Sequence, residues 1–380
     1  MKSPLYLFCL CIISVFISSC GDIVEYEVSG PYSDQEFAVL SANLNLPSTY
    51  FIYGESSGFP DSKPNHQVNA MATLGRVLFY DTQLSSDNTV SCASCHKQEL
   101  AFSDDIAFSH GVNGKVTTRN SLALGVFKSF STYSEDPGTQ LFWDGRVTTL
   151  SEQMAQSLES PNEMGMKLAD LIPKLNNLEY YTILTKKAFG TEQMESWMPF
   201  AAMESFINSL SSNQAKIDFI QFPANSTQTT QHWTNFTDEE NMGKNIFFGN
   251  CNTCHSAGLF EGEVDFASNG LDLTYDDNGV GEITNRYEEY GVFKVPSLRN
   301  IELTAPYMHD GRFKTLEEVV DFYSENIQDH PNLHPALEYP TGDPKKLELS
   351  AEEKSALISF LKTMTDQTIL AEPKWSNPFL

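Results

Sequence analysis

Hydrophobic residues recur with helical spacing in several parts of the chain, whereas the alternation typical of strands is scarce. The helical pattern covers residues 166–189, 192–220 and 350–365. The last of these begins with Ser350 and Glu353, which have the spacing of a helix-capping box. A short helix is expected over residues 74–81, and residues 261–292, rich in Gly, Asp and Asn, predict a long loop with room for one hairpin. The pattern predicts a mainly α-helical protein.

Residues 315–323 carry a regular pattern of the same kind. Thr315 and Glu318 have capping-box spacing. The residues that follow at i, i+3, i+4 and i+7 are Leu316, Val319, Val320 and Tyr323. They share one apolar face of a helix, and such a face usually packs into a core. On this pattern alone, Tyr323 is a packed core aromatic residue.

The first twenty residues have the pattern of a secretory signal peptide. An apolar run, residues 5–16, follows the segment's one charge, Lys2, and is too short to span a bilayer. Small residues then precede Cys20, which Gly21 follows, and this resembles the bacterial lipobox. We expect cleavage before Cys20 and lipidation of its thiol; the alternative is an ordinary signal cut nearby. Either places the mature protein in the cell envelope, as a periplasmic or outer-membrane protein, with lipid as its only membrane anchor.

Two pentapeptides have the spacing that attaches a c-type haem. They are Cys92-Ala93-Ser94-Cys95-His96 and Cys251-Asn252-Thr253-Cys254-His255. Residues three and four apart share a face of a helical turn, so both thiols reach one porphyrin and the next histidine turns onto the iron. The four thiols also suit one zinc site, but the adjacent histidines have no role there. The motifs predict two covalent haems with His96 and His255 as iron ligands.

The segments before the two motifs are alike, which indicates an internal duplication. Each has a glycine, a basic residue and aromatic residues, at 75–80 and at 243–248. The motif histidines are about one domain length apart. We expect two cytochrome c-like haem domains with a long loop region between motifs and little β-structure. The expected division is a signal peptide at 1–20, a tether and loosely structured arm at 21–68, an N-terminal haem domain at 69–235, a C-terminal haem domain at 236–366 and a tail at 367–380.

The charge of the chain excludes one class of partner. The formal net charge is −26 at pH 7, whereas a nucleic-acid surface needs clustered Lys and Arg. An acidic surface can steer a basic redox partner, and it also serves simply to keep an exported protein soluble. Nucleic acid is therefore not an expected partner.

Several stretches between and after the haem motifs carry a family resemblance. They are Arg119-Asn120, Phe142-Trp143-Asp144-Gly145-Arg146, Glu163-Met164-Gly165, residues 299–307 and His309-Asp310-Gly311-Arg312. Over residues 70–365 they resemble the bacterial di-haem cytochrome c peroxidase family, which includes the MauG-type enzymes. The resemblance implies reduction of hydrogen peroxide at the N-terminal haem, with electrons delivered through the C-terminal haem from a small c-type cytochrome. The MauG-type alternative is oxidation of a partner protein's side chain, and the non-enzymatic alternative is a dihaem electron carrier.

The resemblance also implies which residues act on peroxide. Counting along the family pattern from Trp143 places the polar distal residues at Gln153 and Glu163. The carboxylate would move the proton and the amide would orient the oxygen atoms. Without the family pattern, both are ordinary solvated residues. Trp143 matches the aromatic residue that lies between the haems and helps electrons cross, although a tryptophan is usually a core residue.

Two further sites follow from the resemblance. A calcium ion between the domains would be bound by the side chain of Asn120 and the backbone carbonyls of Thr304 and Pro306; alone, Asn120 is a turn residue. The position of the second haem's distal ligand, a methionine in ordinary peroxidases, falls on Tyr323. A tyrosine there resembles the MauG-type enzymes, and an anionic phenolate favours ferric and higher oxidation states. A core role for Tyr323, Met308 as the ligand, and a five-coordinate iron are the alternatives.

Two positions depart from the family pattern. His110 lies near the removable distal histidine of the first haem, but it is displaced by two residues relative to Arg119-Asn120, so it is either that ligand or a loop residue. Ser157 stands where the MauG-type enzymes have a proline near the peroxide site. The shape of that pocket is therefore not predicted by the resemblance.

Overall fold

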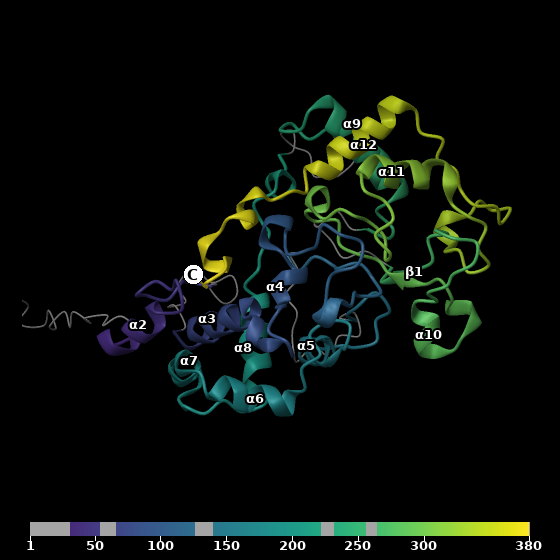
Figure 1. Ribbon diagram of the computed structural model, residues 1–380. Helices are drawn as coiled ribbons and strands as arrows, with labels where there is room; N and C mark the ends of the chain where they lie inside the picture. The colour runs from purple at the N-terminus through teal and green to yellow at the C-terminus, as the bar shows by residue number, and fades with distance from the viewer. Residues whose placement is uncertain (1–30, 54–65, 126–139, 222–231, 256–263, 380) are drawn as a thin grey trace, which may run out of the picture.

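The computed structural model describes residues 31–53, 66–125, 140–221, 232–255 and 264–379. Its α-helices are α2 (Asp34–Ser41), α3 (His66–Tyr80), α4 (Cys92–Cys95), α5 (Leu150–Glu159), α6 (Leu168–Asn176), α7 (Glu179–Phe189), α8 (Met198–Ile207), α9 (Asp238–Asn250), α10 (Val280–Thr284), α11 (Leu316–Asp321) and α12 (Ala351–Lys362). Two short strands, β1 (Phe266–Ala267) and β2 (Phe293–Lys294), pair antiparallel. The mainly α fold with little β-structure is confirmed. Residues up to 235 are called the N-terminal half below, and residues 236–366 the C-terminal half. In Figure 1, α2, α3 and α5–α8 of the N-terminal half lie in the lower part, and α9, α11 and α12 of the C-terminal half lie in the upper part, with α10 lower at the right.

Each half contains a pair of closely packed helices with a glycine at the contact. In the N-terminal half α3 packs on α8, and a Cβ atom on Gly75 would lie 2.0 Å from the carbonyl oxygen of Ala202. In the C-terminal half α9 packs on α12, and a Cβ atom on Gly243 would lie 1.8 Å from the carbonyl oxygen of Ala356. Only glycine allows the two backbones to approach this closely. The shared arrangement agrees with an internal duplication.

The basic residue after each glycine is buried in its half. Arg76 is 2% exposed, and its Nε donates to the backbone oxygen of Ser376 at 2.6 Å. Lys244 is 1% exposed, and its Nζ lies 5.0 Å from the centre of the Trp233 ring. A buried cation requires such partners because desolvation is costly. The sequence similarity before the two haem motifs therefore corresponds to a similar packing role.

Residues 31–53, the described part of the N-terminal arm before α3, are more ordered than expected. Ser33 and Glu36 form a capping box at the start of α2, and Leu40 and Leu44 are buried in the core of the N-terminal half. The backbone of Leu44 pairs with that of Phe379 in an isolated bridge. Apolar contacts with sequence-distant residues therefore stabilise a segment whose composition alone indicated a loosely structured arm.

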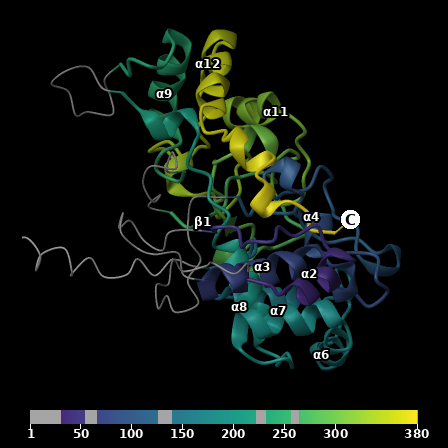
Figure 2. The same ribbon diagram turned by 90° about the vertical axis from the view of Figure 1, so that its left-hand side faces the viewer.

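The C-terminal tail folds back onto the N-terminal half, so that the chain ends beside it in Figures 1 and 2. The amide of Gln98 donates to the backbone oxygen of Ile369 at 3.1 Å, and the hydroxyl of Tyr80 donates to that of Trp375 at 2.7 Å. Ile369 and Trp375 belong to the core of the N-terminal half. The tail therefore connects the end of the C-terminal half to the segment that carries the first haem motif.

Several helix boundaries differ from the sequence prediction. Within 192–220, the α-helix is confined to α8, which has Pro199 in its first turn and ends before Asn208. The pattern at 166–189 divides into α6 and α7. Among the described residues of 261–292, the β1–β2 ladder encloses the long loop and α10 lies within it. The capping boxes at Ser350 and Thr315 are confirmed.

Candidate haem and peroxide site

The first C-x-x-C-H motif forms one helical turn with its histidine directly after it. Cys92 and Cys95 bound α4, and the backbone N–H of His96 donates to the carbonyl of Cys92 at 3.0 Å. The Nδ1 atom of His96 lies 2.9 Å from the carbonyl oxygen of Phe102. A ring nitrogen held by a carbonyl carries the proton, which leaves Nε2 to bind a metal. This donor set fits a c-type haem.

The second motif has the same arrangement at the end of α9. The backbone N–H of His255 donates to the carbonyl of Cys251 at 2.8 Å, and Nδ1 lies 3.0 Å from the carbonyl oxygen of Pro296. Cys251, Cys254 and His255 line a cavity of about 510 Å³, within the usual size of cofactor sites. Two thiols, an oriented imidazole and an adjoining cavity fit the second haem.

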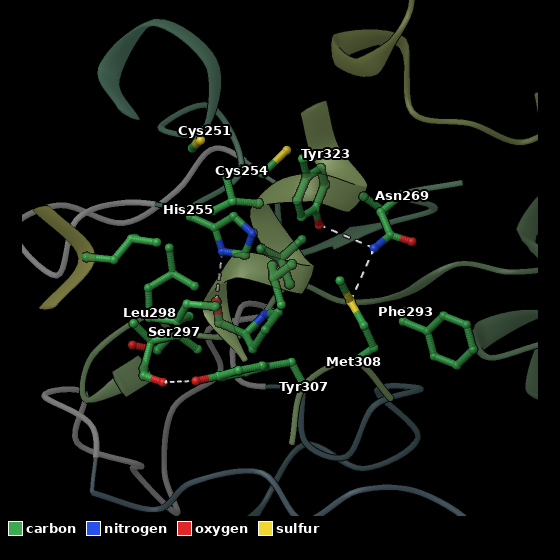
Figure 3. A pocket seen from close by; sticks show the side chains of 18 of the residues that line it. Cys251, Cys254, His255, Asn269, Phe293, Ser297, Leu298, Tyr307, Met308 and Tyr323 are labelled. Carbon is green, nitrogen blue, oxygen red and sulfur yellow. Dashed lines mark hydrogen bonds between the residues drawn. The ribbon is translucent and has the colours of Figure 1, made fainter. Parts of the chain in front are cut away.

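Tyr323 and Met308 lie at the wall of this cavity, on the side of Asn269 (Figure 3). The side-chain nitrogen of Asn269 is 3.2 Å from the hydroxyl of Tyr323 and 3.6 Å from the sulfur of Met308. Burial raises the pKa of Tyr323 to about 12, and the hydrogen bond from Asn269 acts in the opposite direction. The Tyr323 hydroxyl and the Met308 sulfur, the two candidate ligand atoms, therefore both contact the Asn269 amide. The assignment of Tyr323 as the iron ligand stays a prediction.

The backbone around Tyr323 is unusual. After α11 the chain continues as a π-helical turn, Phe322–Asn326. Such turns are rare and occur frequently at functional sites. The wider turn carries Tyr323 at the cavity wall, while its neighbour Phe322 is buried in a small core with Leu271. The expected apolar face thus contributes both to a core and to the cavity.

Glu163 lies between the end of α5 and α6, and burial raises the pKa of its carboxyl group. Hydrogen bonds from the hydroxyls of Ser157 and Ser160 act in the opposite direction, as does the charge of Arg146. The carbonyl of Glu163 accepts from the N–H of Val112 at 2.8 Å. Glu163 is half-buried, and its carboxyl group lies within hydrogen-bonding reach of two serine hydroxyls; its role at the peroxide site stays a prediction.

The Glu163 carboxylate is also close enough to the first haem motif to influence its thiols. Burial raises the pKa of Cys92 to about 12 and that of Cys95 to about 11, and Glu163 is among the smaller contributions to both. Gln153 is half-buried on α5, four residues before Ser157 and so on the same helix face. Glu163 therefore lies near the first motif, and Gln153 shares a helix face with Ser157, a partner of Glu163.

Trp143 links the two halves. Its indole N–H donates to the carbonyl of Asn120 at 2.9 Å, and its own carbonyl accepts from the N–H of Lys294 in β2 at 2.7 Å. The ring is 8% exposed and lines the cavity beside the second motif. The neighbouring Asp144 pairs with Arg119, which also forms a two-bond pair with Asp277 at 2.6 and 2.7 Å. A network of partly buried ion pairs thus holds the tryptophan at the boundary.

The three predicted calcium ligands lie on one cavity. Asn120, Thr304 and Pro306 all line the cavity of the second motif. The Nδ2 atom of Asn120 donates to the carbonyls of Ile106 and Ala107 at 3.2 and 3.4 Å. Its Oδ1 atom is therefore the side-chain atom left to ligate a cation, and carbonyl and amide oxygens suit calcium. The ion itself stays a prediction.

The structure bears on the zinc-site alternative and on the position of His110, but not on Cys20. Among the residues that the structure describes, no group of three or more His, Cys, Asp and Glu side chains is placed to hold a metal ion. The four thiols therefore do not converge on one zinc site. His110 is exposed in a short bridge with Val116. Cys20 lies outside the described residues, and within them no helix is long and apolar enough to cross a membrane.

The sequence analysis identified Ser157 only as a departure from the family pattern, and it did not identify several other residues that hold the site. Ser157 and Ser160 contact Glu163, Ser121 lies 3.3 Å from Nδ1 of His96, and Asn269 contacts Tyr323. The spacing between Gln153 and Ser157 was a signal that could have been used. Asn269 lies in a loop, where no periodic pattern marks a side chain that faces a cavity.

Comparisons with known proteins place the chain in a family. The family model for di-haem cytochrome c peroxidases matches residues 69–224. The methylamine utilization protein MauG of Methylophilus methylotrophus is 31% identical over 320 residues, which cover 80% of this chain and 86% of that relative. Cytochrome c551 peroxidase of Nitrosomonas europaea is 28% identical over 316 residues, which cover 82% and 83%.

A solved structure agrees with these relatives. The crystal structure of a MauG-like protein associated with microbial copper homeostasis is 31% identical, with a TM-score of 0.69, and the match covers 86% of this chain and 99% of that one. The chain is therefore a peroxidase, and it belongs to the di-haem cytochrome c peroxidase family that includes the MauG-type enzymes.

Proposed function

We propose that this protein reduces hydrogen peroxide in its N-terminal half and receives the electrons for it through its C-terminal half. The observation that carries the proposal is the half-buried Glu163, whose carboxyl pKa is raised by burial. This carboxyl group bonds to the hydroxyls of Ser157 and Ser160, and its charge acts on Cys92 in the first haem motif. A buried carboxyl group with a raised pKa beside an attachment motif is suited to acid–base work. A dihaem electron carrier has no use for such a group.

The N-terminal half supplies the proton chemistry. Glu163, when ionised, accepts the proton from one oxygen of peroxide and returns it to the departing oxygen, which leaves as water. The amide of Gln153 donates to the peroxide oxygen and orients it. Reduction of one peroxide consumes two electrons and two protons and forms two molecules of water. Ser157 and Ser160 hold Glu163 in place for both proton steps.

The haems, when bound to the two motifs, supply the iron that reacts with peroxide and stores and passes electrons. His96 and His255 would bind this iron through Nε2, and a backbone carbonyl at Nδ1 orients each ring. Trp143, fixed by Asn120 and Lys294, lies on the boundary between the halves and is the residue that we expect to assist electron passage. Tyr323 is proposed as the distal ligand of the second iron.

Two further features belong to this proposal. Asn120, Thr304 and Pro306 hold one calcium ion beside the cavity of the second motif, where it stabilises the boundary that fixes Trp143. Cys20 is lipidated after export, which anchors the protein at the cell envelope without a spanning helix. The acidic chain then favours a small basic c-type cytochrome as the electron donor.

The test is peroxide consumption by the holoprotein with a pre-reduced, basic c-type cytochrome as donor. Two cytochromes should be oxidised for each peroxide consumed, and the rate should fall as salt is raised because attraction between exposed charges is screened. Peroxide consumption without cytochrome oxidation, at any ionic strength, would refute the electron route.

A second function, oxidation of a partner protein's side chain, is favoured by Tyr323 at the cavity wall. A phenolate ligand would favour the higher oxidation states needed to draw electrons from a protein. In this case the fully oxidised protein reacts with peroxide without prior reduction, and a Tyr323→Met variant loses this reaction. If both proteins require one-electron reduction first, the cytochrome-dependent function stands and the second is excluded.

A further inference from the structure

Two segments of the chain, one in each half, match residue by residue. Residues 141–159 align without a gap on residues 307–325. The pairs of identical residues are Asp144 and Asp310, Gly145 and Gly311, Arg146 and Arg312, Thr149 and Thr315, Leu150 and Leu316, Glu152 and Glu318, and Glu159 and Glu325. The internal duplication therefore extends beyond the haem motifs into the segments that carry the distal residues.

The two segments also share their local structure. Leu141 donates to the carbonyl of Val147 at 2.8 Å, and Tyr307 donates to that of Phe313 at 2.7 Å. The next residue has a positive φ in both segments, 64° at Phe142 and 75° at Met308. These are uncommon values for residues with a side chain, so their occurrence at matched positions supports the alignment.

The helices that follow begin in the same way. Thr149 accepts a hydrogen bond from the N–H of Glu152 at the start of α5, and Thr315 accepts one from the N–H of Glu318 at the start of α11. The two helices are therefore in register from their first residue. In this register Ser157 is the counterpart of Tyr323, the residue proposed above as the distal ligand of the second iron.

The surroundings of the two positions correspond as well. Burial dominates the environment of Tyr323, and the thiols of Cys251 and Cys254 also influence its hydroxyl. In the first half, Glu163 influences the thiols of Cys92 and Cys95, and the hydroxyl of Ser157 bonds to Glu163. Tyr323 lines the same cavity as the second motif, and Ser157 contacts Glu163, whose charge acts on the thiols of the first motif.

We propose that Ser157 occupies the distal-ligand position of the first half and keeps that position open for peroxide. This inference rests on the function proposed above. A serine hydroxyl is one bond from Cβ, whereas a tyrosine hydroxyl lies across a whole ring, so Ser157 stops short of the place where Tyr323 reaches its iron. Its hydroxyl donates to Glu163 instead. Ser157 is thus a positioning residue that leaves room for the substrate and holds the carboxylate that acts on it.

The test is the spin state of the ferric holoprotein, followed by electron paramagnetic resonance and by cyanide binding. The parent should show a high-spin component from the open iron of the His96 haem. Ser157→Tyr should lose most of that component and bind cyanide at least about tenfold more weakly, because a phenolate would occupy the open position. Ser157→Ala should keep the high-spin component, because it provides no ligand.

A matched control and a second variant keep this test decisive. Gln156→Tyr places the same side chain on the exposed neighbouring position of α5 and should leave the high-spin component unchanged. Ser157→Met supplies a slimmer ligand and replaces Ser157→Tyr if the latter fails to retain two haems. An undiminished high-spin component in a folded, dihaem Ser157→Tyr or Ser157→Met protein overturns the inference, as does its loss in Ser157→Ala.

Failure of the inference and failure of the proposed function give different results. If the parent has no high-spin component, the proposed open iron is wrong and the inference falls with it. If Tyr323→Ser leaves the low-spin signal unchanged while Ser157→Tyr abolishes the high-spin signal, the ligand role of Tyr323 is wrong and that of position 157 stands. If Tyr323→Ser raises the high-spin component but Ser157→Tyr has no effect, only the inference about Ser157 is overturned.

Discussion

Replacement of Glu163 by Gln tests the proposed acid–base chemistry directly. Glutamine keeps the size of the side chain and its contacts with Ser157 and Ser160, but it cannot accept a proton at neutral pH. General acid–base groups typically contribute factors of about 10² to 10⁴ in rate. At 1.36 kcal/mol for each tenfold change, the activation free energy of peroxide reduction should rise by about 2.7–5.4 kcal/mol.

The pH dependence gives a second, independent signature. Burial raises the pKa of the Glu163 carboxyl group, and the ionised form is the one that accepts a proton. Turnover by the parent protein should therefore fall as the pH decreases through this raised pKa, at a higher pH than an exposed glutamate would give. Glu163→Gln should lose this acidic limb altogether.

The raised pKa of Glu163 also predicts that Glu163→Gln increases the free energy of unfolding, although it lowers the activity. A carboxyl group whose pKa is raised in the folded state adds stability that is fully present below its unfolded pKa, about 4.3. That stability is lost as the pH rises through the folded pKa. At pH 7 the buried Glu163 carboxylate therefore costs stability, and Glu163→Gln should unfold at higher urea concentration than the parent.

The assay measures peroxide consumption against pH, together with urea unfolding at pH 7, both on the holoprotein. Glu159→Gln is the matched control, because Glu159 is exposed near the end of α5, and neither property should change. A Glu163→Gln protein with unchanged turnover would refute the acid–base role. A loss of both activity and stability would instead indicate that the carboxylate holds the fold.

Three other variants test the fold and the boundary between the halves. Gly243→Ala should lower the free energy of unfolding in urea by about 1–3 kcal/mol, because the new methyl group would overlap the Ala356 carbonyl. The control Asn245→Ala, at an exposed position of the same helix, should leave this free energy unchanged. Equal stability of the two variants would contradict the close helix contact. Truncation after Asp366 removes the buried side chains of Ile369 and Trp375 and should lower stability by about 3–6 kcal/mol, measured by thermal unfolding; an unchanged transition would show that the tail does not support the N-terminal half. Asn120→Ala should weaken calcium binding in isothermal titration relative to Ser121→Ala, and equal affinities would remove Asn120 from the ligand set.

Local interactions account for what the sequence predicted well. The capping boxes at Ser350 and Thr315 depend on residues three apart, so each is complete within one turn of chain. The two C-x-x-C-H motifs are equally local, and the carbonyl that orients His96 is only six residues away, at Phe102. The carbonyl that orients His255 comes from Pro296, 41 residues away, and the motif alone does not predict it. The mainly α fold follows from periodicity, which a helix imposes on any sequence that covers a core.

Non-local contacts account for what the sequence did not predict. The order of the N-terminal arm depends on burial of Leu40 and on pairing with Phe379, near the other end of the chain. The return of the tail depends on hydrogen bonds from Gln98 and Tyr80 to backbone oxygens 271 and 295 residues further along the chain. The residues next to Gln98 and Tyr80 in sequence give no indication of these partners. Composition and periodicity describe neighbours in sequence, and such contacts do not appear in them.

The difference between Ser157 and Tyr323 is visible in the sequence, but only the structure shows that the two residues occupy matched positions in the two halves. Ser157 and Tyr323 follow matched threonine caps at the same spacing, yet one is small and polar and the other large and aromatic. The α-helix of the first half continues through Ser157, whereas the second half changes to a π turn at Phe322. A π turn packs less favourably than an α turn and is retained mainly where a side chain must be placed for function. The π turn at Tyr323 agrees with a ligand role there, and the unbroken α-helix through Ser157 agrees with an iron that has no side chain to bind.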